Sequence, residues 1–386
     1  MKQYFKYGLF LFTLCIQLPV YASNEEKIYA LAHTFMEKNG VPGMSIAVIN
    51  RHQIHFYNLG WADPVKKVPT SNQTIYSIGS FSKTFTAALA ARAMIEKKLN
   101  LKATFIYYFP ELRPNPNLTS ITINELLAHV SGLPFDFNPR PKTYSELINR
   151  LQHFKLTRAA GSEYSYSNAG IGIVGYVLQT IYQQTYQSIL TAKILKPLNM
   201  QATYLQIPTT KEKYLAVGHD SRNNVVAYNK NIETWFAAAS LKSTISDMAQ
   251  YLWAQIHAHT LLDKNLAQAF IMVHKNKYCF ANPITCEQLA WQAHAISELK
   301  SCSGDSFFIK FNPQGFPLFH NKKIINTDLL ANHKIFIDKT GSGYGMSSYM
   351  AYVPEQKIGV VILTNKFLGD TRIKLGRDIL EKILEN

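Results

Sequence analysis

The chain has 386 residues, of which 47% are hydrophobic and 17% charged. This balance excludes a disordered chain and supplies enough apolar side chains for a large core, in one domain or in two interlocked ones. The formal net charge is +15. No run of Lys and Arg exceeds three residues, so we interpret the positive charge as scattered, with a surface that attracts anionic substrates as the other interpretation.

The first 22 residues have the features of a secretory signal peptide. Lys2 and Lys6 precede an apolar segment over residues 8–18 that is too short to span a membrane, and small residues follow it. We expect cleavage near Ala22 and Ser23, export to the periplasm and no stable membrane anchor. Export also argues against a nucleic-acid partner.

In chain order, the spacing of apolar residues predicts a helix (24–38), two strands (44–50 and 54–60), a helix (80–98), three more helices (122–129, 169–186 and 246–257), three strands (334–339, 347–353 and 358–365) and a closing helix (371–384).

This order predicts an α+β fold with two lobes. Strands from both ends of the chain would form one antiparallel sheet flanked by the terminal helices, and the middle of the chain would form a mainly helical lobe. We expect a single domain over residues 23–386, with the sheet lobe at about 23–79 and 321–386 and the helical lobe at about 80–320. A groove between lobes is a common place for a ligand.

A Ser-x-x-Lys motif, Ser80 to Lys83, stands at the start of a predicted helix. The two side chains lie one turn apart on the same face, which puts an amine beside a hydroxyl that is otherwise a weak nucleophile. Ser297 and Lys300 have the same spacing, so the spacing alone is a weak signal. The first copy is distinguished by two later elements, Tyr-Ser-Asn at residues 166–168 and Lys-Thr-Gly at residues 339–341.

These three elements, in this order, resemble the penicillin-recognising serine enzymes, and in detail the class C β-lactamases, which are exported cephalosporinases. Further matching segments extend the resemblance over the whole mature chain, at residues 40–44, 60–63, 79–86, 126–134, 242–249 and 354–366. The resemblance implies the fold of serine β-lactamases and penicillin-binding proteins. It also implies hydrolysis of cephalosporins and penicillins through an acyl-enzyme on Ser80, without a metal or organic cofactor. We expect a monomer.

The resemblance also implies roles for individual residues. The catalytic side chains would be those of Ser80, Lys83, Tyr166 and Lys339. The backbone N–H groups of Ser80 and Ser342 would form the oxyanion hole. The substrate would contact Asn168, Thr340, Gly341 and Asp136.

The identity of the acylation base stays open at this point. Two positive neighbours favour the phenolate form of Tyr166, and the repulsion between Lys83 and Lys339 favours one neutral lysine. Either effect yields a base near Ser80.

The sequence departs from the class C pattern at four positions. Asp338 replaces a common His, Asp136 a common Gln, Ala239 a common Tyr and Asp370 a common Asn. These changes alter the shape and charge of the pocket, so they bear on the substrate range. The second element is Tyr-Ser-Asn instead of the Ser-Asp-Asn of class A enzymes, and the chain has no matching glutamate motif.

Other functions remain as alternatives. A D-alanyl-D-alanine peptidase or an esterase of the same fold would use the same motifs, and a non-catalytic β-lactam-binding sensor domain would keep only the fold. A metal site at His257, His259 and Asp263 is disfavoured, because no further ligands stand nearby. We interpret His129 as a structural residue at a helix end.

Three cysteines follow the signal peptide, at positions 279, 286 and 302. Cys279 and Cys286 are close enough to close a short loop in an oxidising compartment, but the sequence does not assign the pairing.

Overall fold

A computed structural model describes residues 24–230, 234–275, 278–280, 284–301, 309–311, 317–319, 322–325 and 328–385. The predicted signal peptide with its cleavage site, and Cys302, lie outside the described residues. Within the described ranges, no helix is both long and apolar enough to span a bilayer.

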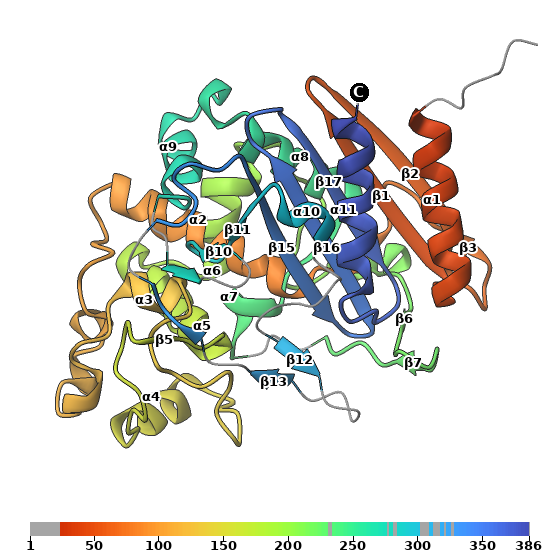
Figure 1. The fold of residues 1–386 in the computed structure, drawn as a ribbon. Helices are drawn as coiled ribbons and strands as arrows, with labels where there is room; N and C mark the ends of the chain where they lie inside the picture. The colour runs from red at the N-terminus through yellow and green to blue at the C-terminus, as the bar shows by residue number, and fades with distance from the viewer. Residues whose placement is uncertain are drawn as a thin grey trace, which may run out of the picture.

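The centre of the described structure is a nine-stranded antiparallel sheet with the order β3-β2-β1-β17-β16-β15-β11-β10-β9 (Figure 1). Its strands are β1 (Gly43–Asn50), β2 (Gln53–Asp63), β3 (Val68–Pro69), β9 (Tyr278–Phe280), β10 (Thr285–Glu287), β11 (Gln292–Ala295), β15 (Ile335–Gly343), β16 (Met346–Val353) and β17 (Ile358–Thr364). Every residue of β16 and β17 is buried. These two central strands are therefore covered on both faces.

Four short strand pairs lie outside this sheet: β4 (Ile75–Ser77) with β8 (Lys242–Thr244), β5 (Glu163–Tyr164) with β14 (Lys322–Lys323), β6 (Gly218–His219) with β7 (Val225–Val226), and β12 (Ile309–Phe311) with β13 (Pro317–Phe319).

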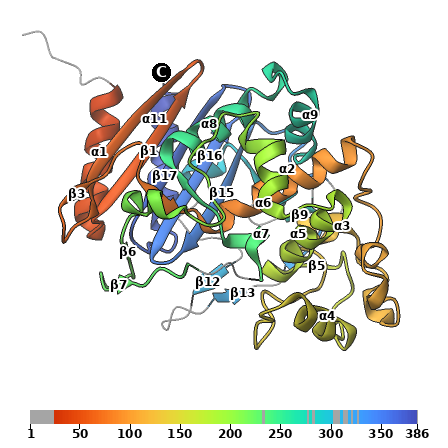
Figure 2. The same cartoon turned by 180° about the vertical axis from the view of Figure 1, so that it is seen from behind.

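Helices cover both faces of the sheet (Figures 1 and 2). The α-helices of the described residues are α1 (Asn24–Asn39), α2 (Ser82–Ile95), α3 (Ile123–Leu127), α4 (Tyr144–Gln152), α5 (Asn168–Tyr182), α6 (Tyr186–Leu190), α7 (Phe236–Ala239), α8 (Ile245–Ile256), α9 (Lys264–Met272), α10 (Glu298–Ser301) and α11 (Thr371–Leu384), and α3 and α4 lie away from the sheet. The terminal helices α1 and α11 enclose a smaller core on one face, with Ile28, Val360 and Ile379 among its residues. The larger core lies on the other face, around α2 and α8.

Helix α2 runs through the larger core. All of its residues from Ser82 to Ala93 are buried, so it has no exposed face. Residues 87–91 read Ala-Ala-Leu-Ala-Ala, and such small side chains let α5, α7 and α9 approach the helix closely. The start of α2 is therefore held rigidly between the sheet and the helical region.

The predicted α+β class, with an antiparallel sheet built from both ends of the chain, is confirmed. The sheet differs from the prediction at one edge, where residues 278–280, 285–287 and 292–295 form the added strands β9, β10 and β11. The sequence pattern assigned this segment to helices and loops. Each of these strands has only three or four residues, which is too short for an alternating pattern to be recognised.

The disulfide left open by the sequence joins Cys279 and Cys286. These residues lie directly opposite each other in the β9–β10 pair. The bridge therefore ties the last two strands of the sheet edge together.

Helix α5 packs closely on α7 because two of its residues are glycines. A Cβ atom at Gly172 would lie 2.2 Å from the Trp235 ring, and one at Gly175 would lie 2.4 Å from the Ala237 side chain. The ring of Trp235 is held in place, because its Nε1 donates a hydrogen bond to Asp136.

We predict that Gly172→Ala destabilises the protein by about 1–3 kcal/mol, because the added methyl overpacks this contact. The sign is informative, since Gly→Ala inside a helix otherwise stabilises by about 1 kcal/mol. Urea unfolding measures the difference. Gly170→Ala in the same helix is the matched control, because its nearest neighbour would be 3.3 Å away and its loss of stability should be smaller. A Gly172→Ala variant as stable as the parent would contradict this account.

Candidate active site

Ser80 lies in the 3₁₀ turn Gly79–Phe81, which leads directly into α2. The Ser82 hydroxyl fixes this turn, because it donates to the Gly79 carbonyl (2.7 Å) and accepts from the Leu241 amide (3.0 Å). Gly79 has a positive φ of 50°, and a Cβ there would lie 2.5 Å from the backbone nitrogen of Ser342. The turn that carries Ser80 therefore lies against the backbone of β15.

Lys83 follows one helical turn later, and its side chain is fully buried. Its Nζ lies 3.1 Å from Ser80 Oγ, 2.6 Å from Asn168 Oδ1 and 3.0 Å from the Ala238 carbonyl oxygen. Burial lowers the pKa of Lys83 well below its ordinary value, and the charge of Lys339 lowers it further, although Asp136 acts in the opposite direction. A neutral amine is thus favoured beside the Ser80 hydroxyl.

Lys339 approaches from β15 and meets Tyr166, which precedes α5. The two terminal atoms, Lys339 Nζ and Tyr166 Oη, are 3.5 Å apart. Both lysines also lie over the Tyr166 ring, with Nζ 4.8 Å (Lys83) and 5.3 Å (Lys339) from its centre. The structure therefore brings together the four predicted catalytic side chains, which come from three distant segments of the chain.

Burial also sets the protonation of this pair. It raises the pKa of Tyr166, and a hydrogen bond with Ser80 opposes this only in part. Burial lowers the pKa of Lys339 to about 8, although the negative charges of Glu287 and Asp338 act in the opposite direction. Burial therefore favours the neutral form of both groups, the phenol of Tyr166 and the amine of Lys339, and the nearby carboxylates counteract this for Lys339.

Asn168 begins α5, and its amide oxygen accepts from Lys83. Its backbone nitrogen donates to the Phe135 carbonyl (2.8 Å), and the neighbouring Ser167 hydroxyl caps the helix by accepting from Gly170 (2.9 Å). The Tyr-Ser-Asn element is therefore a helix start with Tyr166 and Asn168 on the side of Lys83.

The Lys-Thr-Gly element is part of β15, which runs to Gly343 and so extends past the end of the predicted strand at 334–339. A Cβ at Gly341 would lie 2.2 Å from the Ile78 carbonyl oxygen and 2.4 Å from Ser348 Oγ, so glycine is required for this close approach. Thr340 and Ser342 are partly exposed on either side of it.

Asp136 uses both carboxylate oxygens inside the protein. Oδ1 accepts from Trp235 Nε1 (2.5 Å) and Oδ2 from Arg140 Nε (2.6 Å). Of the other departures, Ala239 is partly exposed at the end of α7, and Asp338 is buried behind Lys339.

Two residues at this site were not singled out for it by the sequence. His129, interpreted above as structural, stacks on Tyr166 with ring centres 4.1 Å apart, and its Nδ1 accepts from the Ser167 amide (3.1 Å). Burial and the charges of the two lysines hold its pKa well below the ordinary value, so the ring is neutral.

The second missed residue is Glu287, on β10. Its side chain is buried, and burial raises its pKa to about 8 against the opposing charge of Lys339. The sequence pattern assigned its segment to helices and loops, so no sequence signal indicated a carboxylate at this site.

His257, His259 and Asp263, which were disfavoured above as a metal site, do not form a group of metal ligands in the structure. Asp263 pairs with Arg92 (2.7 Å) and caps α9 through the Leu266 amide (3.0 Å). Among the described residues, the only three potential ligands that lie close together are Cys279, Cys286 and Asp328, and the cysteines are joined in the disulfide.

The second Ser-x-x-Lys copy lies on the surface. Ser297 and Lys300 are exposed, and Lys300 pairs with Glu381 of α11. The spacing is therefore shared, but the surroundings that lower the pKa of Lys83 are not.

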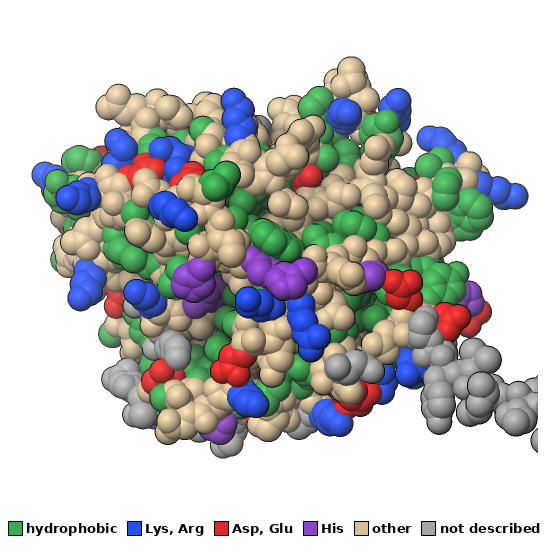
Figure 3. All heavy atoms as spheres, turned by 90° about the horizontal axis from the view of Figure 1, so that it is seen from above, with side chains coloured by type: hydrophobic (Ala, Val, Ile, Leu, Met, Phe, Trp, Pro, Cys, Tyr) green, Lys and Arg blue, Asp and Glu red, His purple; other side chains and the backbone are tan. Residues whose placement is uncertain are grey.

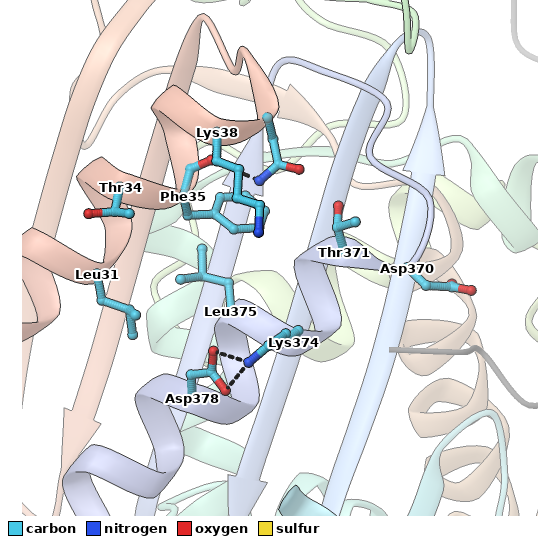
Figure 4. Close-up of a pocket in the computed structure, with 10 residues that line it drawn as sticks. Leu31, Thr34, Phe35, Lys38, Asp370, Thr371, Lys374, Leu375 and Asp378 are labelled. Carbon is cyan, nitrogen blue, oxygen red and sulfur yellow. Dashed lines mark hydrogen bonds and ion pairs between the residues drawn. The ribbon is translucent and has the colours of Figure 1, made fainter. Parts of the chain in front are cut away.

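A groove of about 470 Å³ lies between α1 and α11 (Figure 4). Leu31, Phe35 and Leu375 supply apolar side chains, and an ion pair of Lys374 with Asp378 (2.7 Å) lies at one side. The groove is on the face of the sheet that α1 and α11 cover, whereas Ser80 is on the other face.

The face seen in Figure 3 carries its Lys and Arg side chains among acidic, apolar and histidine side chains, without one continuous basic patch. For this face, the picture supports the interpretation of scattered positive charge.

Comparison with known proteins places this chain in a family. A family model described as beta-lactamase matches residues 28–382. A beta-lactamase of Providencia stuartii is 28% identical over 391 residues, covering 99% of this chain and 98% of that protein. A crystal structure of a class C beta lactamase is similar with a TM-score of 0.81 and 28% identity, covering 93% of this chain and 97% of that one.

A structure described as a beta-lactamase/D-alanine carboxypeptidase from Pseudomonas syringae is also similar, with a TM-score of 0.82 and 25% identity over 93% of this chain and 99% of that one. The family match spans most of the chain, and its residues include all three motifs around Ser80. The chain therefore belongs to the beta-lactamase family and is a serine hydrolase of the class C type.

Proposed function

We propose that this protein hydrolyses the β-lactam amide of cephalosporins and penicillins through an acyl-enzyme on Ser80. The observation that carries the proposal is the meeting of Ser80, Lys83, Tyr166 and Lys339, with Lys83 Nζ 3.1 Å from Ser80 Oγ and Lys339 Nζ 3.5 Å from Tyr166 Oη. A nucleophile, a base and a proton relay in contact are what acyl transfer requires.

In the acylation step, Ser80 Oγ attacks the lactam carbonyl carbon and its proton passes to Lys83. Lys83 is our choice of base because burial and Lys339 lower its pKa, whereas burial raises the pKa of Tyr166. As the C–N bond breaks, Tyr166 donates its proton to the leaving nitrogen and regains one from Lys83. This relay keeps the phenol neutral before and after the step.

Backbone groups would stabilise the tetrahedral oxyanion. The N–H groups of Ser80 and Ser342 are brought close by the contact of Gly79 with β15. Each donor of this kind contributes roughly 3–4 kcal/mol to the barrier.

Side chains around this centre would hold the substrate. Lys339 and Thr340 suit the substrate carboxylate, and Asn168 suits the substrate's side-chain amide. Because the Asn168 amide oxygen already accepts from Lys83, its NH2 group would donate to the substrate. Gly341 would allow the substrate to lie along β15. Asp136 would affect substrate binding indirectly, through Trp235 and Arg140, whose side chains donate to its carboxylate.

In the deacylation step, a water attacks the ester carbonyl. Tyr166 accepts a proton from that water as it passes its own to Lys83, and the proton then returns to Ser80 Oγ when the C–O bond breaks. The enzyme is regenerated with the protons in their initial places.

We also propose that residues 23–386 form one catalytic domain, exported to the periplasm as a monomer after removal of residues 1–22. The charged and apolar parts of that leader support export. The mass of the protein recovered from periplasm gives its first residue, and a mass that includes the leader would contradict this part of the proposal.

Removal of the nucleophile is the direct test of the function. We predict that Ser80→Ala lowers the turnover of a chromogenic cephalosporin by roughly a thousandfold or more, because the acyl-enzyme no longer forms. Ser297→Ala is the matched control, since it alters the exposed copy of the same motif and should keep parental turnover. If the parent protein consumes neither a cephalosporin nor a penicillin, the proposed function is wrong.

The protonation of Lys339 should appear in the pH profile. Its ammonium form binds the substrate carboxylate below a pKa of about 8, so kcat/KM should fall as the pH rises through that value. Lys339→Arg keeps its charge at high pH. We predict that this variant moves the alkaline limb upward by roughly one unit or more. Lys374→Arg, at an exposed position of α11, should leave the limb unchanged, and an unshifted limb in Lys339→Arg would contradict the assigned role.

A D-alanyl-D-alanine peptidase is the second candidate, favoured by the similarity to the beta-lactamase/D-alanine carboxypeptidase. The two functions share acylation and differ in the rate of deacylation. After mixing with penicillin, intact-mass measurement should show a rapid return to free enzyme, because Tyr166 and Lys83 supply the proton transfers for deacylation. An adduct that persists for many minutes would instead support the peptidase.

A further inference from the structure

Asp338 directly precedes Lys339 on β15, and only 4% of its surface is exposed. Three donors reach its carboxylate: His294 Nε2 at 3.1 Å, Tyr349 Oη at 2.8 Å and Arg377 Nη2 at 3.2 Å. These donors come from β11, β16 and α11. The carboxylate therefore connects β15 to both neighbouring strands and to the C-terminal helix (Figure 1).

Phe336 completes this cluster, two residues before Asp338 on the same face of β15. Its ring stacks on His294 with centres 4.8 Å apart, and the Arg377 guanidinium lies 5.0 Å from its centre. His294 Nδ1 also contacts Thr285 Oγ1 of β10 at 2.9 Å. The contacts of Asp338 with His294 and Arg377 are thus supported by packing against Phe336 and by the hydrogen bond between His294 and Thr285.

Successive side chains of a strand point to opposite faces of the sheet. Asp338 points to α11, so Lys339 points to the opposite face, where it meets Tyr166. The contacts that hold the Asp338 side chain in place therefore also fix the backbone of Lys339, and with it the direction and position of the Lys339 side chain in the site.

We propose that Asp338 is a positioning residue for Lys339, which holds the lysine toward the substrate and stabilises its charged form from behind the sheet. This inference rests on the proposed function, in which Lys339 binds the substrate carboxylate. It also gives a role to one of the departures from the class C pattern, where an acidic side chain stands in place of the common His.

The charge of Lys339 is set by groups from several elements. Burial lowers its pKa, Glu287 of β10 and Asp338 of β15 raise it, and Arg372 of α11 lowers it. Lys83 of α2 and Lys339 both contact the Tyr166 ring, and His129 stacks on the same ring. Asp338 is thus one of two carboxylates that oppose the effects of burial and of the Arg372 charge on the pKa of Lys339.

Asp338 itself is held ionised. Burial acts to raise its pKa, but the contacts with His294, Arg377 and Tyr349 outweigh this and keep its pKa below the ordinary value. Its negative charge is therefore present wherever Lys339 titrates.

The test is a direct titration of Lys339 that does not depend on turnover. In protein labelled with ¹³C at the lysine ε-carbon, the Lys339 signal is assigned by its loss in Lys339→Met and followed by NMR against pH. Asp338→Asn keeps the shape of the side chain and removes its charge. We predict that the midpoint for Lys339 falls by roughly half a unit or more in this variant.

Asp247→Asn is the matched control, because Asp247 is also a buried carboxylate but lies in the first turn of α8 and accepts from the Ala202 amide and the Thr203 hydroxyl. It should leave the Lys339 midpoint unchanged. If Asp338→Asn does not fold, because the buried Arg377 charge loses the Asp338 carboxylate, the double variant with Arg377→Met is titrated instead. An unchanged Lys339 midpoint in the folded variant would overturn the inference.

Kinetics separate this inference from the proposed function. With a carboxylate-bearing cephalosporin at pH 8, Asp338→Asn should raise KM several-fold and change kcat less, because it weakens binding by Lys339. A parent protein without turnover refutes the proposed function, whereas the NMR midpoints still decide the role of Asp338. Active parent and variant enzymes with the same KM would overturn the inference.

Discussion

The site depends on one backbone contact between segments that are far apart in the chain. The turn at Gly79 and Ser80 lies against β15 so closely that a side chain at Gly79 or Gly341 would collide with backbone atoms. The Ser348 hydroxyl closes the same contact by donating to the Ile78 carbonyl (3.1 Å), across 270 positions of sequence. This approach places the two proposed oxyanion donors together, and it brings Lys339 within reach of the groups around Ser80. The close-packed core around α2 and the central strands makes the contact rigid.

The same packing accounts for the electrostatics. Lys83, Lys339 and Tyr166 are removed from water together, and a buried ammonium is costly unless a carboxylate lies nearby. Lys83 lacks such a partner in direct contact and is favoured as the neutral base. Lys339 has two buried carboxylates acting on it and stays charged up to a pKa of about 8. The surroundings of the two lysines over one phenol ring thus differ in the way that the proposed roles of base and carboxylate ligand require.

Short motifs and long periodic segments were the features that allowed prediction from the sequence. The Ser-x-x-Lys, Tyr-Ser-Asn and Lys-Thr-Gly elements indicated the residues that the fold brings together, and the apolar patterns predicted the α+β class. The edge strands β9 to β11 were missed, because three or four residues show no period. Glu287 and the contacts of Asp338 were missed for a related reason: their surroundings come from residues far away in sequence. The choice between Lys83 and Tyr166 also required burial, which the sequence does not display.

The central claim is that Ser80 carries the covalent intermediate. Its most direct measurement is peptide mapping of the protein quenched in acid during turnover of a slowly released β-lactam. The account predicts a single acyl group, on the peptide that contains Ser80, and none on the peptide that contains Ser297. An acyl group on any other residue, or consumption of the β-lactam without a trapped adduct at Ser80, would contradict it.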